Sequence, residues 1–267
     1  EDTSKKGVCE PKKVAIMKQG VERAIVDIMK TSRMYGSFWS ALTFAAALTM
    51  ATVSFSETAS NVILFIGDGM GAEQIKAGRL FKATNLVFES WPVQGAVKTH
   101  SANAAITDSA ASGTAMATGH KVNNGVISLA MPGDGREYET LLEFAKRRGK
   151  RVGLVTSTAM THATPAAFGA HENSRYNYAD IAHDYLLRSR PHVLFGGGGA
   201  GMTYGAAITQ GYAVVTDRIE MQGLTNTVTY ASGQFGTGHL PYEYDGLGDL
   251  PHLSEMTQTA LDLLDGG

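Results

Sequence analysis

Three polar side chains stand where a reactive group would be expected. Asp68 lies between two glycines directly after an apolar segment, Ser109 follows an aspartate and precedes a run of small residues, and Arg175 ends the segment "FGAHENSR". A carboxylate on a glycine turn can bind a cation or satisfy nearby backbone amides. A serine hydroxyl needs a base or a metal ion to act as a nucleophile. A guanidinium can hold two phosphate oxygens at once, whereas a lysine cannot, and a solvated surface arginine is the alternative.

The surroundings of Ser109 favour an anion near its hydroxyl. The alanine-rich segment 109–118 predicts a helix, with Thr107 and Asp108 available to cap its first turn. The free N–H groups and the dipole at such a helix start stabilise a negative charge. We interpret the alanines and Gly113 as clearing space above the hydroxyl. A simple capping role for Ser109 is the alternative.

Alternating strands and helices must position these side chains. The expected strands cover residues 61–66, 95–100, 151–157, 192–196 and 212–216. The expected helices cover residues 72–83, 109–118 and 177–190, with three more starting after a capping box at Thr140 and Glu143, at Thr164–Pro165, and at Ser254. This order predicts an α/β fold with a mostly parallel central sheet flanked by helices. Sites in such sheets gather at the carboxyl ends of strands, which brings Asp68, residues 107–109 and residues 158–164 to one edge.

Length and composition exclude several classes of protein. The chain has 267 residues, 43% of them hydrophobic, and a net charge of −2, which fits one large globular domain or two small ones. This near-neutral balance predicts no nucleic-acid binding. Cys9 is the only cysteine, so no intrachain disulfide can form.

The N-terminal part reads as a targeting segment. Residues 29–56 are typical of a signal peptide, because two cationic residues precede an uncharged, mostly apolar run over residues 38–53 that ends in small residues. We therefore expect an exported protein, periplasmic or secreted. Residues 1–28 form an upstream leader to which we assign no role.

Three ordered segments resemble one known family. The segments "NVILFIGDGMG" (61–71), "TDSAASGTAMATG" (107–119) and "THATPAAFGAHENSR" (161–175) are similar to the N-terminal signature segments of the alkaline phosphatase family. The segments "FGTGHLPYEYD" (235–245) and "LSEMTQTALDLL" (253–264) resemble that family in the same order. The resemblance implies that residues 57–267 are the N-terminal part of an alkaline phosphatase domain.

The resemblance also implies roles for particular residues. Ser109 matches the nucleophile that takes the phosphoryl group, forming a phosphoserine that water then hydrolyses. Arg175 matches the arginine that clamps the phosphate, and Asp108 matches the acid that helps to hold that arginine. The implied substrates are small-molecule phosphomonoesters, and the complete protein is expected to be a homodimer.

The family site holds two zinc ions and one magnesium ion. Asp68 matches the carboxylate shared between a zinc and the magnesium, Thr164 matches a magnesium ligand, and Ser109 faces the zinc pair. His162 stands where family members carry aspartate or histidine near the third metal, and a plain hydrogen-bonding role is its alternative.

The sequence departs from the family after residue 264. The family continues with a glutamate ligand, an Asp-x-x-x-His pair, an Asp-His dipeptide and a further histidine, none of which has a counterpart here. His183 and His252 each follow an aspartate by three positions instead of four. We therefore expect the sheet to be incomplete at the C-terminus and this chain to be inactive or nearly so, although the complete protein would be a phosphomonoesterase.

Other functions fit parts of the sequence. Residues 196–201, "GGGGAG", match a dinucleotide-binding loop, with Glu220 near the position of a ribose-binding acid, which would indicate an oxidoreductase. The short spacing from this loop to residues 212–216 disfavours a crossover helix. A related metal-dependent phosphodiesterase or sulfatase, and a non-catalytic remnant of the family, are the remaining alternatives.

Overall fold

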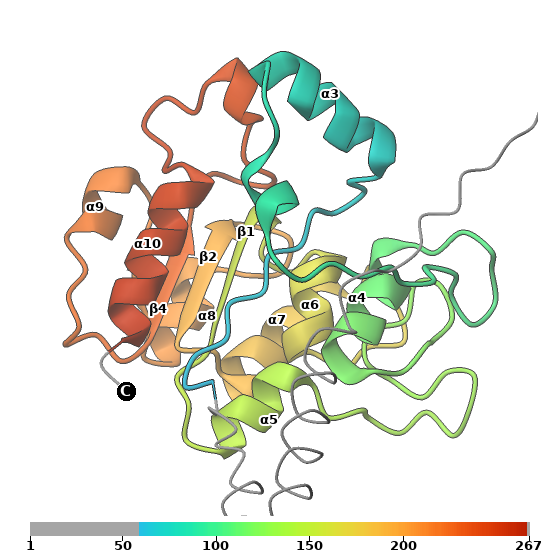
Figure 1. Ribbon diagram of the computed structural model, residues 1–267. Helices are drawn as coiled ribbons and strands as arrows, with labels where there is room; N and C mark the ends of the chain where they lie inside the picture. The colour runs from blue at the N-terminus through green and yellow to red at the C-terminus, as the bar shows by residue number, and fades with distance from the viewer. Residues whose placement is uncertain (1–58, 266–267) are drawn as a thin grey trace, which may run out of the picture. The chain divides into compact units, whose positions relative to one another are not determined.

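The computed structural model describes residues 59–265 (Figure 1). Contacts divide the chain into two compact units, residues 1–65 and 66–267, and every helix and strand described below belongs to the second. The predicted leader (1–28) and signal peptide (29–56) lie outside the described residues. Within residues 59–265, we find no helix with the length and apolar character that a membrane crossing needs.

A four-stranded sheet forms the centre of the second unit. Its strands are β1 (Gly153–Ala159), β2 (Val193–Gly197), β3 (Ala213–Val215) and β4 (Ala231–Gln234). Their order is β1-β2-β4-β3, and all three pairings are parallel. The predicted α/β class with a mostly parallel sheet is therefore confirmed.

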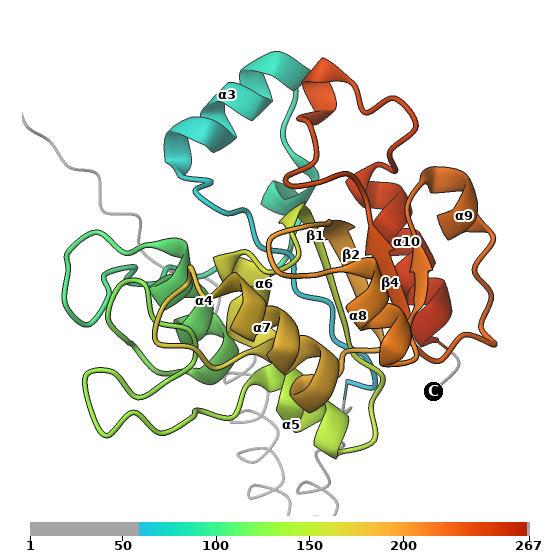
Figure 2. The same ribbon diagram turned by 180° about the vertical axis from the view of Figure 1, so that it is seen from behind.

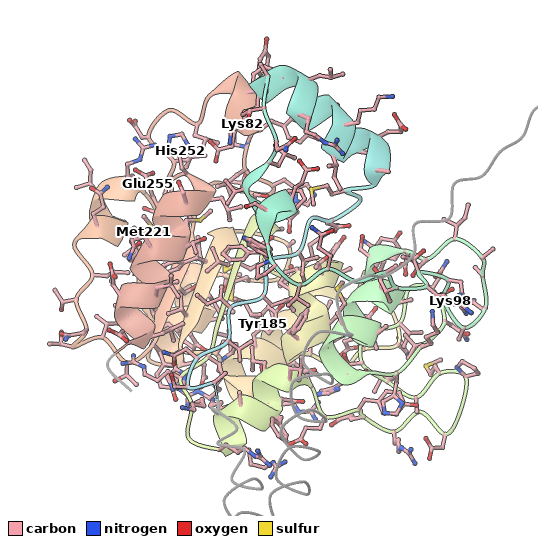
Figure 3. The ribbon with its side chains drawn as sticks, viewed as in Figure 1. Lys82, Lys98, Tyr185, Met221, His252 and Glu255 are labelled. Carbon is pink, nitrogen blue, oxygen red and sulfur yellow. The ribbon has the colours of Figure 1, made fainter. Side chains whose placement is uncertain are left out.

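Helices cover both faces of this sheet (Figures 1 and 2). The helices are α3 (Ala72–Lys82), α4 (Ser109–Thr118), α5 (Leu141–Arg147), α6 (Ala163–Gly169), α7 (Tyr178–Asp184), α8 (Tyr204–Thr209), α9 (Arg218–Gln222) and α10 (Leu253–Leu264). Side chains alternate along β2, so Val193 and Phe195 pack with α9 and α10, whereas Leu194 packs with α6, α7 and α8. Met221 of α9 is fully buried in the first of these layers (Figure 3).

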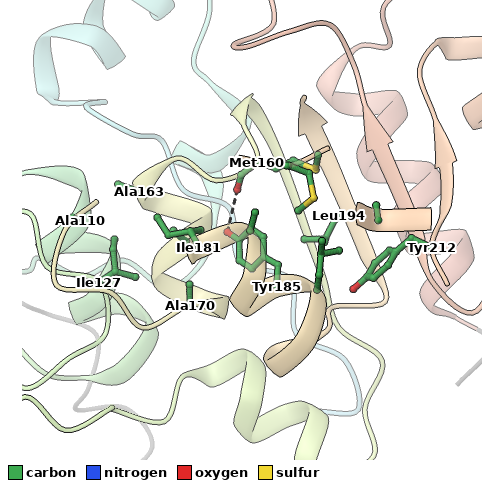
Figure 4. Packing of buried hydrophobic residues seen from close by; sticks show 14 residues of the cluster. Ala110, Ile127, Met160, Ala163, Ala170, Ile181, Tyr185, Leu194 and Tyr212 are labelled. Carbon is green, nitrogen blue, oxygen red and sulfur yellow. Dashed lines mark hydrogen bonds between the residues drawn. The ribbon is translucent and has the colours of Figure 1, made fainter. Parts of the chain in front are cut away.

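The second layer is built around Tyr185 (Figure 4). This residue opens a π-helical turn, Tyr185–Ser189, that continues α7, and its ring is fully buried. Its hydroxyl donates a hydrogen bond of 3.1 Å to the carbonyl oxygen of Met160. Because Met160 lies between β1 and α6, this bond fixes the connection that leads into α6.

Several predicted elements have the expected bounds. Helix α4 covers the predicted residues 109–118, and α3 ends one residue before the predicted end. Helix α5 begins with the predicted capping box, in which the Thr140 hydroxyl accepts from the Glu143 amide and the Glu143 carboxylate accepts from the Thr140 amide. The predicted helix 177–190 is α7 together with its π-helical continuation.

Other predictions are wrong. Residues 61–66 and 95–100 form no strand, since neither is hydrogen-bonded into a ladder in the described part of the chain. Strand β4 has the sequence Ala-Ser-Gly-Gln and was not expected, because it lacks the apolar pattern of a strand. Helix α6 begins at Ala163 after His162, so Thr164 lies inside the first turn instead of capping it. Helix α10 begins one residue before the predicted Ser254.

Candidate active site

The Asp68 carboxylate joins two hydroxyl groups from distant parts of the chain. The Ser109 hydroxyl donates to Oδ1 over 2.9 Å, and the Thr164 hydroxyl donates to Oδ2 over 2.8 Å. Ser109 is the first residue of α4, and Thr164 lies in the first turn of α6, after the carboxyl end of β1. The structure therefore brings these three predicted residues to one edge of the sheet.

A tight turn aims the Asp68 side chain. The Met70 amide donates to the Gly67 carbonyl oxygen (3.1 Å), and Gly69 has a φ of 66°, in the left-handed region that favours glycine. Helix α3 begins directly afterwards, with Gly71 as its N-cap. The glycines of "GDGMG" thus serve the turn that presents the carboxylate.

Asp108 holds the start of α4 and Arg175 together. Its Oδ1 accepts from the Ala111 amide (2.9 Å), which is the predicted N-cap bond. Its Oδ2 accepts from the Gly125 amide and from Nη1 of Arg175, both over 3.0 Å. Thr107 does not cap α4, because its hydroxyl donates to the Asp108 carbonyl oxygen instead. The Asp108 carboxylate therefore fixes the Arg175 guanidinium next to the start of α4, where Ser109 lies.

Arg175 is well fixed for a charged side chain. Its backbone amide donates to the Gly125 carbonyl oxygen (2.7 Å), and its side chain is only 15% exposed. Nη2 lies 3.4 Å from Nε2 of His162. Most of the donors of a guanidinium fork are left for another acceptor, and the planar fork matches two phosphate oxygens.

His162 is held neutral beside this arginine. Burial, with further contributions from Arg175 and His239, lowers the pKa of His162 below its usual value despite the nearby Asp68. Because Arg175 can only donate, Nε2 of His162 accepts and the ring proton lies on Nδ1. That Nδ1 is buried and has no hydrogen-bond partner among the described residues.

His239 was not predicted at the site. Its ring packs edge-on against the ring of His162, with centroids 5.0 Å apart. Its Nδ1 accepts from the Ala159 amide over 3.0 Å, at the end of β1. The only sequence signal was its place in the segment 235–245, which follows β4 at the same edge of the sheet.

The small residues of α4 pack against α6. Ala110, Ala117 and Ala163 are at most 1% exposed, and a β-carbon on Gly113 would lie 3.0 Å from Cβ of Ala167. The interpretation that Gly113 clears space above the Ser109 hydroxyl is therefore wrong. Short side chains instead allow the two helices that carry Ser109 and Thr164 to approach closely.

Three hydroxyl groups cap the carboxyl end of α6. The Ser128 hydroxyl donates to the Ala167 carbonyl oxygen (2.7 Å), that of Thr140 to Phe168 (2.7 Å) and that of Ser189 to Gly169 (2.6 Å). These carbonyl groups have no partner within a helix that ends there. Three separate segments thus fix α6, and none of these contacts was predicted.

An ion pair between the buried His171 and the half-buried Glu143 lies next to these caps. Nε2 of His171 lies 2.9 Å from Oε1 of Glu143, and its Nδ1 lies 3.0 Å from the Ser128 carbonyl oxygen. Both partners accept hydrogen bonds, so the ring carries two protons and a positive charge. Burial opposes that charge, but the hydrogen bonds to Glu143 and Ser128 raise the pKa of His171 above its usual value. Burial likewise opposes the ionised Glu143, whose pKa is nevertheless lowered by the bond to His171.

The oxygen atoms around Asp68 fit magnesium better than zinc. One carboxylate and the hydroxyls of Ser109 and Thr164 form an oxygen set, which Mg²⁺ prefers, usually with water ligands as well. Zinc sites use three or four protein ligands that include histidine or cysteine. Residues 59–265 contain no cluster of three or more histidine, cysteine, aspartate or glutamate side chains that could hold a metal ion. The described residues alone therefore do not form a zinc site.

The glycine loop 196–201 has no room for a dinucleotide. A β-carbon on Gly198 would lie 2.8 Å from the Gly236 carbonyl oxygen, so another backbone segment already fills the space. Glu220 accepts from the Thr216 amide and hydroxyl near the start of α9, which occupies the proposed ribose-binding acid. These contacts disfavour the oxidoreductase alternative.

Comparison with known proteins identifies close relatives. A family model described as "Alkaline phosphatase" matches residues 59–266. Alkaline phosphatase 3 of Bacillus subtilis (strain 168) is 39% identical over 223 residues, covering 76% of this chain and 47% of that protein. The tissue-nonspecific alkaline phosphatase of Homo sapiens is 36% identical over 142 residues, covering 47% of this chain and 27% of that protein. The chain thus spans about half the length, or less, of these relatives.

Solved structures agree with this result. A cold-active alkaline phosphatase from a psychrophilic Shewanella species aligns with a TM-score of 0.65 at 35% identity, over 75% of this chain and 52% of that one. The Thermus thermophilus alkaline phosphatase aligns with a TM-score of 0.66 at 32% identity, over 76% and 46%. A variant of the alkaline phosphatase TAB5 with Mg bound in its M3 site aligns with a TM-score of 0.68 at 27% identity, over 77% and 60%.

Proposed function

Because this chain belongs to the alkaline phosphatase family, we propose that the complete protein hydrolyses phosphomonoesters through a phosphoserine at Ser109. The observation that carries the proposal is the convergence of Asp68, Ser109 and Thr164, with Arg175 held beside them by Asp108. A reachable hydroxyl at a helix start, next to a fixed guanidinium, is the arrangement that phosphoryl transfer to a side chain needs.

The chain's own residues serve the reaction as follows. Arg175 binds two non-bridging phosphate oxygens and orients the phosphorus toward Ser109. The Ser109 oxygen attacks the phosphorus while the bond to the ester oxygen breaks, and the alcohol leaves with a proton. Water then attacks the phosphoserine and releases phosphate, which restores the serine hydroxyl. The amides at the start of α4 stabilise negative charge throughout.

We propose metal ions at the same edge of the sheet. Asp68 and Thr164 would hold a magnesium ion, with His162 beside it. When bound, two zinc ions and one magnesium ion would lower the pKa of the nucleophile and stabilise the leaving oxygen. Asp68 and Ser109 would join the zinc pair, whose remaining ligands would come from outside residues 59–265. We therefore propose that this chain alone turns over slowly or not at all.

Hydrolysis of p-nitrophenyl phosphate with added Zn²⁺ and Mg²⁺ tests both parts. Zinc-dependent turnover that disappears in Ser109→Ala would support the nucleophile and refute the argument about missing ligands. Absent turnover would agree with that argument, and phosphate binding would then test the rest. If Arg175→Lys binds inorganic phosphate as well as the native chain does, the proposed clamp is wrong.

The same assay distinguishes the related chemistries. Bis(p-nitrophenyl) phosphate and p-nitrophenyl sulfate report diester and sulfate hydrolysis. Faster turnover of either than of the monoester would favour a phosphodiesterase or a sulfatase. We further propose export, with a mature chain that begins after residue 56, and a homodimeric complete protein. N-terminal sequencing and sedimentation test these two proposals.

A further inference from the structure

Positively charged side chains are concentrated at the amino ends of β1 and β2, opposite the candidate active site. Five of the six residues from 146 to 151 are lysine or arginine, and they lie in the last turn of α5 and in its connection to β1. The fold adds Arg190, which precedes β2, to the same place. Lys146 marks the junction, since its Nζ donates to the carbonyl oxygens of Ser189 (2.7 Å) and Arg190 (2.6 Å). We call Lys146, Arg148, Lys150, Arg151 and Arg190 the basic surface.

These cations lack acidic partners. Arg147, the remaining cation of the run, pairs with Glu139 over 2.7 Å. In the part of the chain that the structure describes, no carboxylate lies within 4.0 Å of any of the five cations of the basic surface. Burial and, to a smaller extent, the nearby Arg190 charge lower the pKa of Lys146. The pKa of His192 is lowered by burial, by Lys146 and by Arg151.

Structural roles account for only some of these side chains. Lys146 satisfies carbonyl groups at the end of the π-helical turn, and Arg190 donates to the Gln210 carbonyl oxygen (2.8 Å) and lies over the Tyr230 ring. Arg148 and Lys150 are exposed, and neither makes a side-chain hydrogen bond or ion pair with another described residue. These two charges are therefore available to a partner.

Apolar side chains adjoin the exposed charges. Leu141 is 54% exposed and Phe144, one helical turn later, is 36% exposed. The Arg148 guanidinium lies 4.0 Å from the centroid of the Phe144 ring. Cations beside exposed leucine and phenylalanine are typical of segments that lie in the interface of an anionic membrane. An exposed leucine adds nothing to contacts with a nucleic-acid backbone, so the apolar side chains favour a membrane over a nucleic acid.

The basic surface and the candidate active site lie at opposite ends of β1. Arg151 comes just before the strand and His162 just after it, so the seven residues of β1 separate the two by about 20 Å. We propose that the basic surface binds anionic phospholipid headgroups, which holds the protein on a membrane face while the candidate active site stays open.

Vesicle flotation tests the proposal. The full chain is mixed with phosphatidylcholine vesicles that contain either no phosphatidylglycerol or about 30% of it, at about 50 mM and about 500 mM NaCl. The test variant is Arg148→Gln/Lys150→Gln, and the matched control, Lys82→Gln/Lys98→Gln, removes two exposed lysines labelled near α3 and at the periphery in Figure 3. The apolar run at residues 38–53 is common to all three proteins, so the measured quantity is the difference between them.

We expect the test variant to bind the anionic vesicles roughly 30-fold more weakly than the native chain at low salt, because each cation near such a surface contributes about fivefold. The control should stay within about twofold, and high salt should abolish the difference. Equal binding by the two variants overturns the proposal. It is also overturned if the test variant loses binding to a DNA duplex but keeps its binding to vesicles, since the surface would then serve a nucleic acid.

Discussion

The Ser109 hydroxyl donates a hydrogen bond of 2.9 Å to the carboxylate of Asp68, which lies 41 residues earlier in the chain. The other oxygen of the same carboxylate accepts from Thr164, 96 residues later. Asp68 therefore joins the turn before α3 to the two packed helices, α4 and α6, that carry Ser109 and Thr164. Among the described residues, no other carboxylate accepts hydrogen bonds from both hydroxyls.

Replacement of Asp68 should remove magnesium binding. Asp68→Asn keeps the shape of the side chain but loses the charge that attracts a divalent cation, so we expect Mg²⁺ affinity to fall by at least about tenfold. Titration calorimetry with MgCl₂ measures this. Asp134→Asn, at an exposed loop aspartate, is the control and should change nothing. Equal affinities for the two variants would exclude Asp68 as a ligand.

Replacement of Arg175 by lysine should weaken phosphate binding. A lysine keeps the charge but cannot form two parallel hydrogen bonds, and one charged bond is worth about 1.5 to 3 kcal/mol. We expect the Kd for inorganic phosphate to rise by about tenfold to a hundredfold. Arg136→Lys is the control, because Arg136 is exposed and pairs only with Asp134. A comparable loss in both variants would mean that phosphate binds by charge alone.

Asp108 and Asp217 offer a matched comparison of stability. Both cap a helix, but the Asp217 carboxylate accepts only from the Glu220 amide, whereas Asp108 also holds Arg175. We expect Asp217→Ala to lower the free energy of unfolding by about 1 kcal/mol and Asp108→Ala by about 3 kcal/mol, since it leaves a mostly buried charge unpaired. Urea denaturation measures both. Equal losses would show that Asp108 acts only as a cap.

Gly113 should not tolerate a larger side chain. Gly113→Leu forces atoms into the contact with Ala167, and overpacking of this kind costs about 1 to 3 kcal/mol. Gly205 lies in α8 with no atom within 4 Å of the place where its β-carbon would be. Gly205→Leu should therefore be neutral or stabilising by up to about 1 kcal/mol, as helix propensity predicts. The melting temperature should fall in Gly113→Leu and should stay unchanged or rise in Gly205→Leu.

The His171–Glu143 pair predicts a pH-dependent stability. The pKa of His171 is raised on folding, so its contribution is complete below the unfolded value of about 6.5 and is lost as pH rises through the folded pKa. The pKa of Glu143 is lowered, so its contribution is complete above about 4.5 and is lost as pH falls through the folded pKa. The pair is therefore most stabilising between these two values.

Comparison of His171→Gln with the native chain measures this effect. At about pH 5.5 we expect the variant to be less stable by up to about 3 kcal/mol, because the half-buried Glu143 carboxylate loses its cationic partner. The difference should shrink as the pH is raised to about 9. His183→Gln is the control, since the His183 side chain is 62% exposed. A difference in urea midpoint that does not vary with pH would contradict the charged state of His171.

Local chemistry made some elements predictable. Helices α4 and α5 begin at an Asp108 cap and a Thr140–Glu143 capping box, whose partners lie within three residues. Strand β4 has no apolar pattern that would predict it. Its polar residues Ser232 and Gln234 are fully buried only because neighbouring strands and helices cover them. The prediction of a strand at 61–66 relied on an apolar run, but a strand there or at 95–100 also requires a neighbouring strand, which the sequence does not show.

The same distinction holds at the candidate site. Asp68, Ser109 and Arg175 were found from their residue types, their neighbours and their resemblance to a family. The contacts that support them were not, because Ser128 caps a carbonyl 39 residues away and His239 contacts an amide 80 residues away. Such pairings depend on the assembled fold. The small residues of α4 were misread for the same reason, since their packing partner is another helix.

The close contact of α4 with α6 has one more effect. Because methyl groups and bare α-carbons meet there, neither helix can gain freedom by turning a side chain into another rotamer. The distance between the Ser109 and Thr164 backbones is therefore fixed by the packing of α4 against α6. A larger ion or a bulkier ester therefore has to be accommodated through the turn that bears Asp68, because that turn lies outside the contact between α4 and α6.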